Sequence, residues 1–264
     1  MKPPVLTDRT ALNRHRARAT AMFLQELAVD EVLQRQAEVN RTFTNPVVVT
    51  AFPSLWPQML SVADEDVLAL APAEHDLAIH SMCLHWANDP VGQLVQCRNA
   101  LKPDGWFIGL MFGGQTLREL RTCLAQAEIE VTGGLSPRIL PMGEIRDLGS
   151  LMQRAGFGLP VADSFATTVR YRDALHLMHD LRAMGESNAL AARLRHSTRR
   201  SVFERTAEIY QALEDPDGRI PATFEIIVMT GWAPHKDQPK PLRPGSAARR
   251  LADALKVAEL KLPR

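Results

Sequence analysis

The sequence has no glycine before Gly92, although the 264-residue chain contains 15 glycines. Glycine permits backbone conformations and close approaches that a side chain would block. Because glycine-rich loops cradle nucleotides and related cofactors, a loop of that kind is excluded from the first third of the chain.

Cysteine is also scarce. The three cysteines are Cys83, Cys97 and Cys123, and no C-x-x-C pair occurs. An odd number without such a pair argues against a disulfide framework and against a zinc knuckle. We expect three reduced, mostly buried thiols in an intracellular, cytoplasmic protein.

Long apolar runs and excess charge are missing as well. No stretch reaches the roughly 18 apolar residues of a membrane-spanning helix, and the N-terminus lacks the apolar core of a secretory signal. The formal net charge of +1 provides no global field to attract nucleic acid. The sequence therefore predicts neither a membrane span nor a nucleic-acid partner.

The residues that are present alternate between strand and helix patterns. Runs of β-branched or apolar residues predict strands at 47–50, 60–63, 76–83, 106–112, 165–171 and 222–232. Helices are predicted within 5–45, from Pro90, from an N-cap at Thr116, at 145–155 with Gly156 closing it, at 174–184 and at 189–213. Turns are predicted at 102–105 and 215–218. This alternation predicts an α/β protein with a parallel sheet.

Three regions follow from these patterns. Residues 1–45 form a helical arm, and residues 46–234 form the α/β domain, with a helical insert at about 172–214. Residues 235–264 form a basic, proline-containing tail, with a short helix expected at 246–260.

Longer segments carry a more specific pattern. They are DLAIHSMCLHWANDP (76–90), LKPDGWFIGLMFGGQTLRELR (101–121), GGLSPRI (133–139), DLGSLMQRAGF (147–157), MGESNA (184–189), DGRIPATFEIIVMTGW (217–232) and RPGSA (243–247). Over roughly residues 60–247 the sequence resembles one branch of the class I S-adenosylmethionine-dependent methyltransferase superfamily. This is the complex I assembly-factor, arginine hydroxylase-like branch, which is related to the malonyl carrier-protein methyltransferases.

The resemblance implies a Rossmann-like methyltransferase fold with a mostly parallel sheet and a final antiparallel strand pair. It implies S-adenosylmethionine as the cofactor and a protein substrate such as a respiratory complex I subunit. It also implies either methyl transfer or hydroxylation of a protein arginine, because a mitochondrial member of the branch is implicated in the latter.

The N-terminal third departs from the family pattern. The family opens with a strand, a glycine-rich turn and a helix, but Phe52 and Pro53 stand where the glycines belong. The stretch from Thr50 to Ser61 is too short for the usual helix and second strand, which need about 10 and 5 residues. We expect a shortened N-terminal βαβ region, an N-terminal helix over the vacant side of the sheet, and weak or absent cofactor binding.

Two residues are candidates for cofactor binding. Residues 63–68 (ADEDVL) resemble the family's A-D-E-E-x-L-P-F segment, whose first acid contacts the adenine amino group, and Asp64 matches that acid. Ser81, near the end of the predicted strand 76–83, is the second candidate. An acidic cluster of this kind is equally typical of a solvated loop.

His85 and Trp86 are the candidate catalytic residues. They follow a predicted strand at its carboxyl end, where open α/β sheets bind ligands. Histidine exchanges protons near neutral pH, and tryptophan can stack on a substrate. The alternative is a pair that only caps the core.

Gly113, Gly114, Glu186 and Asn188 are the candidate substrate-binding residues. The glycines follow a strand at the same sheet edge, where they would admit a ligand or form a tight turn. Glu186 and Asn188 lie in a polar run within the insert, where the alternative is a helix stop with a new N-cap.

Metal binding is not expected. His176 and His179 are three residues apart on a predicted helix, a spacing that suits a metal, but no third ligand accompanies them.

Three functions remain open at this point: a methyltransferase-like enzyme that uses S-adenosylmethionine, a binding or assembly factor that keeps the fold without the cofactor, and a protein-arginine hydroxylase. The absence of a glycine loop favours the second, and the resemblance favours the other two.

Overall fold

The computed structural model describes residues 5–238, and the chain divides into two units, Met1–Pro234 and His235–Arg264. The helices are α1 (Arg9–Arg16), α2 (Phe23–Glu38), α3 (Pro90–Ala100), α4 (Arg118–Thr132), α5 (Ile145–Arg154), α6 (Ala174–Ala183) and α7 (Arg200–Gln211), with the short 3-10 helices η1 (Pro53–Leu55) and η2 (Leu84–Trp86). The strands are β1 (Pro46–Val49), β2 (Leu60–Val62), β3 (His75–Ser81), β4 (Leu101–Phe112), β5 (Gly158–Tyr171) and β6 (Ile220–Trp232). In the second unit residues 235–238 form a turn, and the helix predicted at 246–260 lies outside the described residues.

The six strands form one sheet in the order β2-β1-β3-β4-β6-β5. The first four strands in this order are parallel neighbours. β6 runs antiparallel to β4, and β5 runs antiparallel to β6. The predicted α/β fold, with a mostly parallel sheet and a final antiparallel pair, is confirmed.

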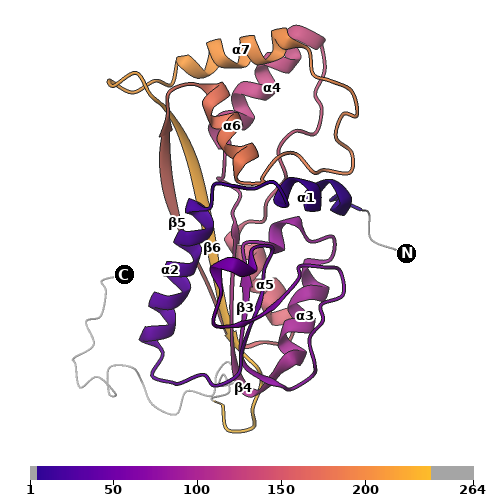
Figure 1. The fold of residues 1–264 in the computed structure, drawn as a ribbon, viewed down its shortest axis with the longest axis vertical. Coiled ribbons are helices and arrows are strands. Elements are labelled where there is room, and N and C mark those ends of the chain that lie inside the picture. The colour runs from indigo at the N-terminus through magenta and orange to yellow at the C-terminus, as the bar shows by residue number, and fades with distance from the viewer. Residues whose placement is uncertain (1–4, 239–264) are drawn as a thin grey trace, which may run out of the picture. The chain divides into compact units, whose positions relative to one another are not determined.

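Helices cover both faces of the sheet (Figure 1). Side chains of β4 alternate between the two sides, as the pleat of a strand requires. Trp106 and Ile108 pack in one core cluster with side chains of α2, whereas Phe107 and Met111 pack in another with side chains of α3 and α5. At about 25 cal/mol per Å² of buried apolar surface, these two layers supply most of the stabilisation.

The N-terminal part of the sheet is shortened, as predicted. The parallel strands β1 and β2 are joined by a segment whose only helix is η1. Phe52 and Trp56, which flank η1, are buried. Bulky side chains therefore fill the connection in which the family has a glycine turn and a full helix.

The insert forms a separate helical layer near the ends of the long strands β5 and β6 (Figure 1). There α4 packs against α7, and α6 packs against both α7 and β5. Its helices lie beyond the carboxyl end of β4. They therefore cover the end of the sheet formed by the carboxyl ends of the parallel strands, where ligands bind in open α/β folds. Within residues 5–238, none of the helices has the length and hydropathy needed to cross a membrane.

The helix predicted over residues 189–213 begins only at Arg200, so its first half is wrong. Residues 189–191 pair with the N-terminal segment instead: the Asp8 amide donates to the Ala189 carbonyl (2.8 Å), and the Ala191 amide donates to the Leu6 carbonyl (2.8 Å). These long-range hydrogen bonds satisfy the backbone in an extended conformation, which overrides local helix propensity.

Two local details also differ from the sequence prediction. Thr116 does not cap α4, because its hydroxyl donates to the Glu225 carbonyl (3.0 Å) and the cap is Leu117 in a left-handed conformation. The turn predicted at 102–105 is part of β4, which begins at Leu101. Asp104, with φ 64°, marks the irregularity that the turn residues produce within this strand.

Candidate functional site

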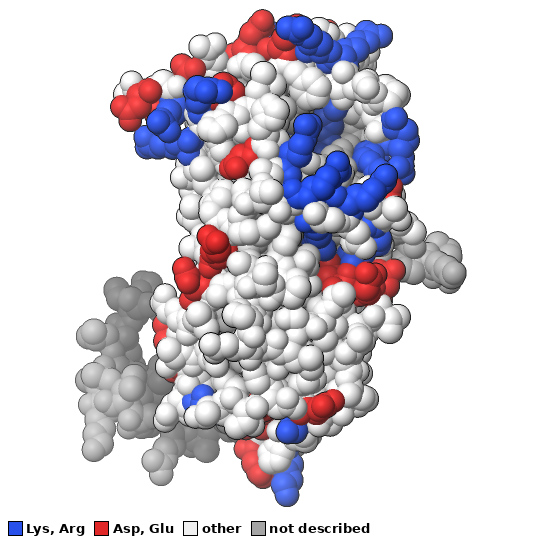
Figure 2. All heavy atoms as spheres, in the orientation of Figure 1, with Lys and Arg blue, Asp and Glu red and all other residues white. Residues whose placement is uncertain are grey.

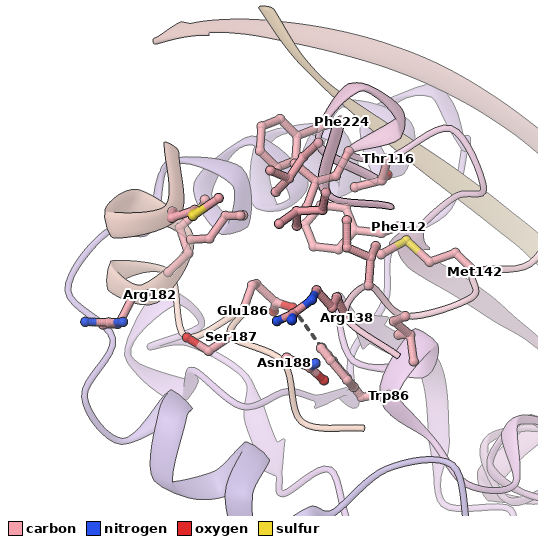
Figure 3. A pocket seen from close by; sticks show the side chains of 18 of the residues that line it. Trp86, Phe112, Thr116, Arg138, Met142, Arg182, Glu186, Ser187, Asn188 and Phe224 are labelled. Carbon is pink, nitrogen blue, oxygen red and sulfur yellow. Dashed lines mark hydrogen bonds between the residues drawn. The ribbon is translucent and has the colours of Figure 1, made fainter. Parts of the chain in front are cut away.

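A cavity of about 270 Å³ opens between the end of β4 and the helices of the insert (Figure 3). Most of its wall is apolar: Phe112, Leu117, Leu120, Leu124, Ile139, Leu140, Met142, Met178, Leu181, Met184, Phe203 and Phe224. Polar groups of Trp86, Arg138, Glu186 and Asn188 gather at one end, while Arg182 points away from the cavity at its edge. An apolar cavity with a few convergent polar groups is the usual form of a ligand site.

Glu186 is the acidic residue of this cavity. Its Oε2 atom accepts a hydrogen bond from Trp86 Nε1 (2.7 Å) and lies 3.6 Å from His85 Nε2. Within the described chain its Oε1 atom has no hydrogen-bond partner. Burial acts to raise the pKa of Glu186, but His85 and Arg16 outweigh it, and the net shift is downward. The cavity wall therefore contains a largely buried carboxylate, one oxygen of which has no hydrogen-bond partner among the described residues.

A glycine turn delivers Glu186 to the cavity. α6 ends at Ala183, and Gly185 follows its C-cap Met184 with φ 79°, the left-handed conformation that glycine adopts without strain. A Cβ atom at Gly185 would lie 3.1 Å from the Cα atom of Arg16, so α1 also requires glycine here. The turn reverses the chain, and Glu186 then points into the cavity (Figure 3).

The other polar residues at this end are already engaged. Arg138 donates to Glu128 (2.6 Å) and to the Thr198 hydroxyl (2.9 Å). The Asn188 side chain donates to the Pro137 carbonyl (2.8 Å) and accepts from the Leu190 amide (3.0 Å). These contacts hold the cavity wall in place, although the Nε atom of Arg138, like Oε1 of Glu186, has no hydrogen-bond partner among the described residues.

His85 lies behind the wall, fully buried, with its ring centroid 4.9 Å from that of Phe112. Trp86, Glu186 and Asn188 are thus three sequence candidates that the fold brings together. His85 contacts the same cluster from behind, through the Glu186 carboxylate and the Trp86 ring.

Asp64 lies in a different place, under α1. It accepts hydrogen bonds from Arg16 (2.8 Å), Arg9 (3.1 Å) and Gln93 (3.1 Å). Its side chain is only 1% exposed. Burial acts to raise the pKa of Asp64, but the charge of Arg16, followed by His80 and Arg9, lowers it to about 2. The carboxylate is ionised and enclosed by partners from within the chain.

An open hollow of about 490 Å³ lies beside Asp64. Its lining comes from α1 and its C-cap, from the segment after β1, and from β2 and the residues after it: Asn13, Arg16, Ala17, Thr50, Ala51, Pro53, Ser61, Val62, Ala63, Asp64 and Glu65. Ser81 is not among these residues and is buried at the end of β3.

The two glycine candidates face protein side chains. A Cβ atom at Gly113 would lie 2.4 Å from Glu225 Oε2, and one at Gly114 would lie 2.4 Å from Glu144 Oε1. Neither glycine lines the cavity. Across residues 5–238, no group of three or more His, Cys, Asp or Glu side chains is arranged to hold a metal ion, including around His176 and His179.

Sequence reasoning missed Arg9 and Arg16 as the partners of Asp64. A signal was present, because residues seven apart lie on the same face of a helix. It was not decisive, since the pattern does not say which surface that face meets. The apolar wall of the cavity was also missed, because its residues come from segments that only the tertiary fold assembles.

Comparison with known proteins tests the resemblance seen in the sequence. The chain is 41% identical over 205 residues to the mitochondrial arginine-hydroxylase NDUFAF5 of Danio rerio, which is 78% of this chain and 64% of that protein. It is 35% identical over 178 residues to the malonyl-acyl-carrier-protein O-methyltransferase of Xylella fastidiosa (strain M23), which is 67% of this chain and 58% of that protein. The chain therefore spans about three fifths of the length of these curated relatives.

No family model matches the chain. Among solved structures, a SAM-dependent methyltransferase from Thermotoga maritima aligns with a TM-score of 0.42 and 12% identity, covering 80% of this chain and 92% of that one. The sequence similarity to the curated relatives confirms the resemblance. The chain belongs to the class I methyltransferase superfamily, in the branch that holds the arginine hydroxylases and the malonyl carrier-protein methyltransferases.

Proposed function

We propose that this chain is a methyltransferase-fold protein that binds a side chain of a partner protein in its apolar cavity and does so without S-adenosylmethionine. The observation that carries the proposal is the position of Asp64. The acid that matches the family's adenine contact is enclosed by Arg16 and Arg9 of the chain's own N-terminal helix.

The rest of the cofactor side does not fit S-adenosylmethionine either. The cofactor's carboxypropyl and ribose groups need close approach to the backbone after the first strand, which a glycine provides. Here Phe52 and Pro53 follow β1, and Ala17 and Asn13 of α1 line the hollow beside Asp64. Both features argue for a degenerate cofactor site.

The cavity supports the binding half of the proposal. A buried carboxylate is costly unless a cation or a hydrogen-bond donor compensates it. Glu186 retains an unpartnered oxygen among the described residues, and Trp86 beside it offers an aromatic wall. A cationic side chain with an apolar stem, such as that of arginine, complements this combination.

Hydroxylation of a protein arginine is the second candidate function. It is favoured by the 41% identity to a protein named arginine-hydroxylase and by the fit of the Glu186 carboxylate to a guanidinium group. Because the chain resembles complex I assembly factors, a respiratory complex I subunit is the first partner to test under either function.

Isothermal titration with S-adenosylmethionine and S-adenosylhomocysteine tests the proposal. We expect no binding heat and no change in melting temperature for the wild-type protein or for Asp64→Asn. Micromolar binding, about −8 kcal/mol, that is lost in Asp64→Asn would overturn the proposal and return the chain to the cofactor-dependent enzymes.

A further inference from the structure

A second hollow, of about 670 Å³, lies beside the apolar cavity. We call it the basic cleft and define it by the side chains that line it: His15, Arg18, His179, Arg182, Ser187 and Asn188. Arg182, Ser187 and Asn188 also line the apolar cavity, so the two spaces are neighbours with a shared wall. α1 contributes one side of the basic cleft, and α6 with the loop after it contributes the other.

The lining of the basic cleft carries positive charge without compensation. None of its lining residues is acidic, and within residues 5–238 neither Arg18 nor Arg182 forms an ion pair. Figure 2 shows basic side chains, which the sequence identifies as arginines, gathered over α1 and the loop after α6, around a hollow in this face.

The nearby acid Asp8 does not cancel this charge, because it is shared by two other arginines. Asp8 accepts from Arg193 (2.9 Å) and Arg195 (3.0 Å). The pKa of His15 is lowered, first by burial and then by the positive charges of Arg18 and other arginines. The basic cleft thus has a local positive potential although the net charge of the chain is only +1.

We propose that the basic cleft binds an acidic segment of the partner protein while a neighbouring side chain of that segment enters the apolar cavity; this rests on the proposed function. Consecutive Cα atoms are 3.8 Å apart. Acidic residues of the partner within about four positions of the inserted residue can therefore reach the wall that the basic cleft shares with the apolar cavity.

Fluorescence anisotropy with three labelled 11-residue peptides tests this inference on the 264-residue chain. The first peptide has a central arginine with glutamate flanks, the second has the same centre with glutamine flanks, and the third has glutamate flanks with a central alanine. We expect the first to bind about tenfold or more tighter than the second at about 50 mM KCl, and the advantage to shrink at about 500 mM KCl.

Charge-reversal variants locate the contact. Arg18→Glu combined with Arg182→Glu is expected to remove the advantage of the glutamate flanks. Arg154→Glu, an exposed arginine at the end of α5, serves as the matched control and is expected to retain it. The salt dependence tests the same charge effect in the wild-type protein should the double variant fail to fold.

The outcomes separate this inference from the proposed function. Equal binding of the first two peptides overturns the inference, as does tighter binding of a labelled single-stranded oligonucleotide than of the first peptide. If flank charge matters but the central arginine and alanine peptides bind equally, the basic cleft is supported and the proposed role of the cavity fails.

Discussion

Asp64 shows how one buried ion pair makes stability depend on pH. Burial opposes its charge, but Arg16 lowers its pKa from 3.8 to about 2. Because the folded-state pKa lies below the unfolded-state value, the contribution is present above about pH 4 and is lost as the pH falls toward 2. By this shift, about 2 kcal/mol of stability is at stake.

Urea unfolding of the wild-type protein and of Asp64→Asn between pH 6 and pH 2 measures this contribution. Asparagine resembles the protonated carboxyl group, so the stability gap between the two proteins is expected to narrow by about 2 kcal/mol as the pH falls. A gap that stays constant over this range would mean that the charge of Asp64 does not stabilise the fold.

Gly113 is required by packing against β6. An added Cβ atom would lie 2.4 Å from Glu225 Oε2 and 2.8 Å from Ile227 Cδ1. We expect Gly113→Ala to lower the free energy of unfolding by about 1–3 kcal/mol. Gly134→Ala is the control, since nothing lies within 4 Å of its added Cβ atom, and it should stay within about 0.5 kcal/mol of the wild type. Similar losses in both variants would refute the packing explanation.

At the residue scale, position along the chain carries enough information to predict some of the residues that line the cavity. Trp86 was predicted because it follows a strand at its carboxyl end, and Glu186 because it lies in a polar run between two helices; both line the cavity. The pairing of Asp64 with Arg16 spans 48 positions in the sequence, and a single chain contains no signal that joins two such distant residues.

At the scale of elements, α1 depends on its tertiary contacts. It has 8 residues, fewer than the roughly 12–15 that an isolated helix needs for even marginal stability in water. Asp8 caps its N-terminus by accepting from the Ala11 amide (3.1 Å), and Leu12 is fully buried. Packing of Leu12 and the arginine contacts to Asp64 therefore hold the helix over the cofactor side.

Leu12→Ala tests this dependence. Removing a fully buried leucine side chain costs about 2–5 kcal/mol, and we expect a loss in that range by urea unfolding. Leu33→Ala, on α2 with the leucine 49% exposed, is the control and should change stability by less than about 0.5 kcal/mol. If Leu12→Ala lost as little stability as Leu33→Ala, Leu12 would not be packed in the core, and α1 would not be docked on the domain in solution.

Elements were predictable where the signal is local. Apolar runs located the strands because their buried residues are consecutive, as in β1 and β3. Residues 189–199 were misassigned because Ala, Leu and Arg favour a helix locally, whereas backbone pairing with residues 6–8 decides their conformation. The length of chain between β1 and β2 was itself informative, since it left no room for the missing helix.

At the scale of the whole molecule, the three cysteines report on three different regions. Cys83 follows β3, Cys97 lies on α3 and Cys123 lies on α4, and all three are buried, free thiols. Burial raises the pKa of Cys83 and of Cys97 to about 12. Because thiol reagents attack the thiolate and need access to it, we expect no reaction in the native protein at pH 8 and three reactive thiols in urea.

The order in which the thiols become reactive tests whether the unit formed by residues 1–234 unfolds as one. Cys123 lies in the core cluster that joins the insert to α2 and the sheet, through residues such as Trp106 and Phe112. Shared packing of this kind favours a single cooperative transition, so the three thiols should become reactive over the same range of urea concentration. Labelling of Cys123 at clearly lower urea would instead mean that α4 and the insert helix α7 packed against it open locally. The apolar cavity would then open and close independently of the sheet, and partner binding would protect Cys123 selectively.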